Sequence, residues 1–166
     1  MKTTSLKWIG LFLLSFILQT SIVPVIDLFG IHPDFPMIVL FFLAFKTGPL
    51  PATWAGFFLG LAQDIYSPSI LGQNALSKTI AGCFAGIFNE RMMRIDIVIQ
   101  MILLITTFLI SDICYFTVQC IKSGGGAGGV FHHLVAFTMP RALYSMAFAL
   151  LPHIKIHFSA APSQRL

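Results

Sequence analysis

The 166-residue chain is poor in charge and in cysteine. Only 10% of its residues are Asp, Glu, Lys or Arg, against about a quarter in ordinary soluble domains. This shortage excludes a disordered chain and a typical cytosolic enzyme. The three cysteines have no CxxC or Cys/His spacing, which excludes a disulfide scaffold and predicts no metal site. What remains is strongly apolar: 57% of residues are hydrophobic and the mean hydropathy is +0.88, as in a membrane protein.

Six apolar runs are separated by short loops that carry polar residues, glycine and proline. A helix needs roughly 20 apolar residues to cross a bilayer. We therefore expect an all-α integral membrane protein, a six-transmembrane-helix bundle in one domain over residues 1–166. The expected helices cover residues 8–29, 36–46, 52–65, 72–88, 95–121 and 130–154. The second run is short for a span, and whether it crosses the bilayer fully stays open.

The basic residues predict how the bundle is oriented, because cytoplasmic loops carry an excess of Lys and Arg. With the N-terminus in the cytoplasm, only Lys122 falls in an outer loop. The cytoplasmic side then holds Lys2, Lys7, Lys46, Arg91, Arg94, Lys155 and Arg165. Both termini should therefore be cytoplasmic. Since the basic residues are scattered singly and form no stripe, we expect no nucleic-acid partner.

Two pairs of glycines with the GxxxG spacing lie in the third and fourth runs. They are Gly56 with Gly60, and Gly82 with Gly86. Small residues four apart on a helix form a groove that another helix can approach closely. Either the two helices pack on each other through these grooves, or the grooves receive a helix of a partner protein.

Charged residues inside the apolar runs are costly and therefore need partners. Asp112 and Arg141 lie at roughly 13 and 16 Å from the outer ends of the fifth and sixth runs, at 1.5 Å per residue. We expect an ion pair between them, either as a packing device or as part of a functional pocket. Asp64 and Lys78 form a second candidate pair near the outer face.

Residues of the third-to-fourth connection are unusually polar for so apolar a chain. With the glycine groove they give a candidate partner-binding set: Gly56, Gly60, Asp64, Gly72 and Asn74. No nucleophile elbow, Ser/His/Asp order or paired carboxylates stand out, so we expect neither catalysis nor a cofactor.

Part of the chain resembles the family of rod shape-determining protein MreD of bacteria. The resemblance covers about half the chain, from Leu18 to about Arg94. It is carried by the order and spacing of glycines in the third and fourth runs, by Asp64, and by the segment LGQNAL from Leu71 to Leu76. Pro33 with Asp34 also belongs to the pattern.

The resemblance implies a non-enzymatic component of the cell-elongation machinery in the bacterial inner membrane. Its partner would be MreC, a single-span protein, and through it the MreB filament, RodA and penicillin-binding protein 2. The resemblance also implies a fold similar to the substrate-binding subunits of energy-coupling-factor transporters. The alternative function is therefore a substrate-capture subunit of a vitamin transporter, with a ligand near Asp64, Lys78, Asp112 or Arg141.

Overall fold

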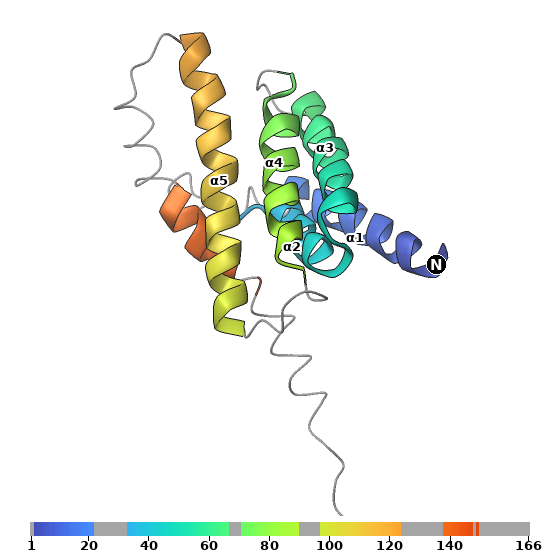
Figure 1. Cartoon of the computed structure of the whole chain (residues 1–166). Helices are drawn as coiled ribbons and strands as arrows, with labels where there is room; N and C mark the ends of the chain where they lie inside the picture. Colours follow the sequence, from blue (N-terminus) through green and yellow to red (C-terminus); the bar gives the residue numbers. More distant parts are fainter. Residues whose placement is uncertain are drawn as a thin grey trace, which may run out of the picture.

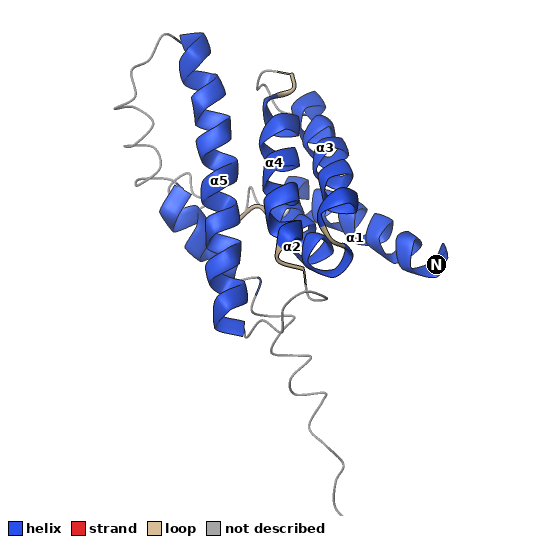
Figure 2. Cartoon of the chain, viewed as in Figure 1, coloured by secondary structure: helices blue, strands red, loops and turns tan. Residues whose placement is uncertain are grey.

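The computed structural model describes residues 2–21, 33–66, 71–89, 97–123, 138–147 and 149, and within these ranges it is helical with no strand. The helices are α1 (Lys2–Ser21), α2 (Phe35–Thr47), α3 (Pro49–Tyr66), α4 (Gln73–Ile87) and α5 (Ile97–Ser123). Residues 138–147 form a further helical segment, which we call the C-terminal segment. Figures 1 and 2 show these helices together with the parts of the chain that are not described.

Helix α4 lies at the centre of the bundle and contacts α2, α3 and α5. Helices α3 and α4 run side by side in opposite directions, and α5 stands on the other side of α4 (Figure 1). Helix α2 fills the space behind them. Its side chains Met37, Leu40, Phe41 and Ala44 are buried in the core, so this short helix is an interior element.

Proline explains where the helices begin. Helix α3 starts at Pro49, three residues before the expected start at residue 52, because a proline in the first helical turn loses no hydrogen bond. Pro36 likewise lies in the first turn of α2. Helix α1 begins at Lys2 rather than at residue 8, since no glycine or proline stops it there. The rest of the expected helices 8–29 and 130–154 lies outside the described residues.

The glycines of both GxxxG pairs lie where α3 and α4 touch. A Cβ atom on Gly82 would sit 2.6 Å from the carbonyl oxygen of Ala52, and one on Gly86 would sit 2.5 Å from Cα of Pro49. On the α3 side of the same contact, a Cβ atom on Gly56 or Gly60 would overlap with the backbone of α4. The two backbones are therefore in contact along their whole length, and α4 occupies the groove that a partner helix would need.

The distribution of polar and apolar side chains is the reverse of that in a water-soluble protein. Charged and polar side chains, among them Asp34, Asp64, Lys78 and Asp112, are buried. Large apolar side chains are exposed on the outer faces, including Ile9, Leu13, Ile17, Trp54, Phe58, Val98, Ile102 and Ile113. A surface of this kind is unfavourable in water and favourable in hydrocarbon.

Among the described residues, one helix is long and apolar enough to cross a bilayer by length and composition, Val98–Lys122 within α5. The shorter apolar helices are Lys7–Ser21 and Phe35–Thr47. Helices α3 and α4 do not reach this limit, and each contains a buried charged residue, Asp64 and Lys78 respectively.

Adding one methyl group at the α3–α4 contact should destabilise the fold. We expect Gly56→Ala and Gly60→Ala each to cost about 1–3 kcal/mol, because the helices must separate to admit the methyl group. Thermal unfolding of the purified protein in detergent measures this effect. Gly10→Ala is the matched control: Gly10 is also helical, but a Cβ there meets nothing within 4 Å. Equal melting temperatures for all three variants would mean that α3 and α4 are not in backbone contact.

Candidate functional site

Asp34 occupies the start of α2 and is almost completely buried. Its Oδ1 accepts a hydrogen bond of 3.0 Å from the backbone N–H of Met37, which makes Asp34 the N-cap of this helix. Its own backbone N–H donates to the hydroxyl of Ser145 at 3.2 Å, so the cap is tied to the C-terminal segment. Gln19 of α1 accepts from the next backbone N–H, that of Phe35, at 3.1 Å. The N-terminus of α2 is thus held from two other elements.

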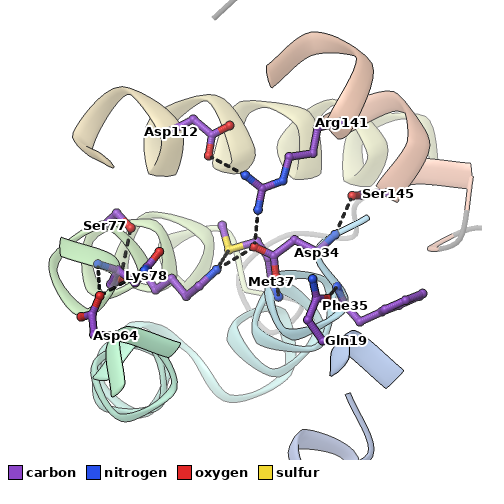
Figure 3. Close-up of polar contacts among 11 residues, drawn as sticks. Gln19, Asp34, Phe35, Met37, Asp64, Ser77, Lys78, Asp112, Arg141 and Ser145 are labelled. Carbon is purple, nitrogen blue, oxygen red and sulfur yellow. Dashed lines mark hydrogen bonds and ion pairs between the residues drawn. The ribbon is translucent and has the colours of Figure 1, made fainter. Parts of the chain in front are cut away.

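Two cations converge on the second oxygen of the same carboxylate. Nζ of Lys78 in α4 and Nη2 of Arg141 in the C-terminal segment each lie 2.9 Å from Oδ2 of Asp34. Figure 3 shows the two side chains approaching Asp34 from different helices. Charge-assisted hydrogen bonds of this length are the strong ones, and burial removes competing water.

Arg141 also faces a second carboxylate, that of Asp112 in α5. The distance between Nη1 of Arg141 and Oδ1 of Asp112 is 3.7 Å, which is an ion pair but longer than a hydrogen bond (Figure 3). The structure thus brings together Asp112 and Arg141, as the sequence predicts. We call Asp34, Lys78, Asp112 and Arg141 the charge cluster. Two carboxylates and two cations give it no net charge.

Asp64 has a different role from the one its spacing to Lys78 suggests. Lys78 is bonded to Asp34, while the Asp64 carboxylate accepts hydrogen bonds from the backbone N–H groups of Gly72, Asn74 and Ala75 at 2.9–3.0 Å. It also accepts one from the side-chain amide of Asn74. Gly72, the N-cap residue of α4, has a left-handed backbone and no side chain to cap with. Asp64 therefore caps α4 from α3, at the helix end that attracts negative charge.

The residues of the candidate partner-binding set differ in exposure, and most of them are buried. Gly56 and Gly60 face α4, and Asp64 is buried at the cap of α4. Gly72 and Asn74 are partly exposed at the α3–α4 connection. Of this set, only Gly72 and Asn74 are accessible at the surface of the described part of the chain.

Asp34 is the member of the charge cluster that reasoning from the sequence missed. It stands in a loop rich in helix breakers, where an aspartate usually contacts water. One signal points to it in retrospect. Asp34 immediately precedes a helix that is apolar on every side and hence buried, so its cap must be buried as well.

A cavity of about 420 Å³ opens beside the charge cluster. Side chains from α1, α3, α4, α5 and the C-terminal segment line it, with Gln19, Ser77, Lys78, Ser111, Asp112 and Arg141 among them. This volume falls within the range of small-molecule sites. The charge cluster can hold α2, α4, α5 and the C-terminal segment in a fixed geometry, and it presents polar groups to a partly open cavity.

Removing the charge of Asp34 should destabilise the protein strongly. In Asp34→Asn the two cations Lys78 and Arg141 are left with only one carboxylate, that of Asp112. Breaking a buried ion pair in this way lowers the free energy of unfolding by about 3–5 kcal/mol. The double variant Asp34→Asn with Lys78→Met should recover part of this loss, because the remaining Arg141 and Asp112 balance each other. Unfolding in detergent measures both variants. Asp34→Asn with Lys46→Met is the control, since Lys46 is exposed at the end of α2; equal recovery there would refute the specific pairing.

Comparison with known proteins identifies the family. The model of the family described as rod shape-determining protein MreD matches residues 1–154. The match includes the whole charge cluster and extends well past Arg94, where the resemblance in the sequence fades. No match was found among curated proteins or among solved structures. Because the family model spans nearly the whole chain, the protein belongs to the rod shape-determining protein MreD family.

Proposed function

We propose that this protein is a non-enzymatic, multi-span scaffold of the rod complex in the bacterial inner membrane. In this role it binds an MreC-like single-span protein and, through it, helps to organise MreB, RodA and penicillin-binding protein 2 during peptidoglycan synthesis. The observation that carries the proposal is the family match over residues 1–154.

The distribution of polarity supports a position within the membrane. Apolar side chains cover the outer faces of α1, α3 and α5, while the buried charges are paired inside the bundle. The positive-inside distribution supports six spans with both termini in the cytoplasm. In such an arrangement the α3–α4 connection and the end of α5 lie on the outer side. Consistent with this, the side chain of Gln73 at the start of α4 donates to the backbone of Tyr115 near the end of α5.

The charge cluster supports a structural rather than a catalytic role. Its strongest hydrogen bonds join helices to one another, and Asp34 uses both carboxylate oxygens in doing so. A rigid bundle of this kind can hold a partner at a fixed place and orientation. We place the contact at the α3–α4 connection, where Tyr66, Leu71 and the partly exposed Gly72 and Asn74 meet the outer side.

Co-purification with the MreC-like protein tests the scaffold proposal. Leu71→Gln at the connection should reduce recovery of the single-span protein severalfold, because an exposed apolar contact is lost. Leu50→Gln is the matched control: both leucines are 73% exposed, but Leu50 lies at the opposite end of α3. Loss of recovery in both variants or in neither would contradict the proposed contact. Recovery of ATPase subunits in place of wall synthases would favour the transport alternative.

Labelling of single cysteines tests the six-span arrangement. In a variant with Cys83, Cys114 and Cys120 replaced by Ala, a cysteine at position 122 should react with an impermeant maleimide in intact cells. A cysteine at position 46 should react only after the cells are opened. Labelling of position 46 in intact cells would overturn the orientation.

A further inference from the structure

Asp112 is the member of the charge cluster whose charge is least satisfied. Lys78 and Arg141 each contact Asp34 at 2.9 Å, whereas the ion pair of the Asp112 carboxylate within the described part of the chain is 3.7 Å, to Arg141. Asp112 is nevertheless only 7% exposed. A buried carboxylate without a hydrogen-bond donor is costly, so this position favours binding a donor from outside the chain.

The cavity gives such a donor access to Asp112. Asp112 and the neighbouring Ser111 both line it, and neither side chain has a hydrogen bond with another described residue. The aromatic side chains of Phe16, Tyr115 and Phe116 line the same cavity. Aromatic rings beside a carboxylate favour a positively charged ammonium group.

Arg141 offers the complementary contact to a negative group. Its side chain is 29% exposed and lines the cavity, and its guanidinium carries more N–H groups than its contacts with Asp34 and Asp112 use. Because the charge cluster has no net charge, a ligand with a single charge would leave an unbalanced charge in a buried site. A ligand that carries both charges leaves none.

We infer that the cavity beside the charge cluster binds a small zwitterionic group, with its ammonium on Asp112 and its anionic end on Arg141. This group belongs either to a free small molecule or to the headgroup of a zwitterionic lipid. The inference goes beyond the scaffold role and does not depend on it.

Calorimetric titration of the purified protein in detergent tests the inference. The probe is glycerophosphoethanolamine, a phosphodiester with one ammonium and one negative charge, and ethanolamine and dimethyl phosphate, which carry the two charges separately, are titrated as its halves. We expect saturable binding of glycerophosphoethanolamine, at least about tenfold tighter than that of either half, since two charge-assisted contacts act together. Either half binding as tightly as the whole would overturn the inference.

Variants separate ligand contacts from folding. Asp112→Asn should weaken binding about tenfold or more. It leaves one unbalanced cation but keeps both 2.9 Å contacts of Asp34, so the melting temperature should fall less than in Asp34→Asn. Ser111→Met fills the cavity without changing charge and should also weaken binding. Thr106→Ala on the exposed side of α5 is the control and should bind like the wild type. Unchanged affinity in Asp112→Asn would overturn the inference.

Native mass spectrometry distinguishes the two sources of the ligand. The protein is released from vesicles of phosphatidylethanolamine and phosphatidylglycerol. A phosphatidylethanolamine retained by the wild type and lost in Asp112→Asn assigns a lipid headgroup. Binding of glycerophosphoethanolamine without such retention assigns a free zwitterion. Absence of both overturns the inference. Since Asp112→Asn should still co-purify with the MreC-like protein, failure here is distinct from failure of the scaffold proposal.

Discussion

One buried carboxylate links three elements of the bundle. Asp34 caps α2 with one oxygen and accepts Lys78 of α4 and Arg141 of the C-terminal segment with the other. Its backbone adds a bond to Ser145. Asp34 is only 4% exposed, so little water reaches it to replace a lost partner. A single side chain therefore links α2, α4 and the C-terminal segment, in addition to the apolar packing between α2 and α4.

Packing and electrostatics divide the work between the two halves of the interface around α4. Toward α3, glycine allows close backbone packing, and Asp64 adds hydrogen bonds at the start of α4. Toward α2 and α5, Lys78 and Gln73 of α4 make an ion pair with Asp34 and hydrogen bonds with Tyr115 and Gln119. Lipid is as apolar as leucine, so apolar side chains alone give little preference for one helix arrangement over another. Glycine contacts and buried ion pairs supply that preference.

Much of the helix pattern was predictable from the sequence. Apolar runs and breakers locate α2 to α5 within about three residues, and the glycine spacing indicates close helix contact. The pairing of charges was only partly predictable. Asp112 and Arg141 are nearly level on neighbouring helices, so depth alone brings them together. Lys78 is different: Asp64 is the nearest acid inside an apolar run, but the backbone N–H groups at the start of α4 compete for that carboxylate. A linear sequence does not show that Gly72 leaves those groups uncapped, nor that the loop residue Asp34 lies inside the bundle.

The composition of the charge cluster has a consequence for synthesis of the chain. Its four charges fall into two neutral pairs in order along the sequence, Asp34 with Lys78 and then Asp112 with Arg141. The ribosome makes the first pair before the second, and each cation follows an acid. Residues 34–78 therefore contain one buried ion pair of their own, Asp34 with Lys78, before Arg141 is made. Arg141 contacts both Asp34 and Asp112, and so links the two pairs into one cluster.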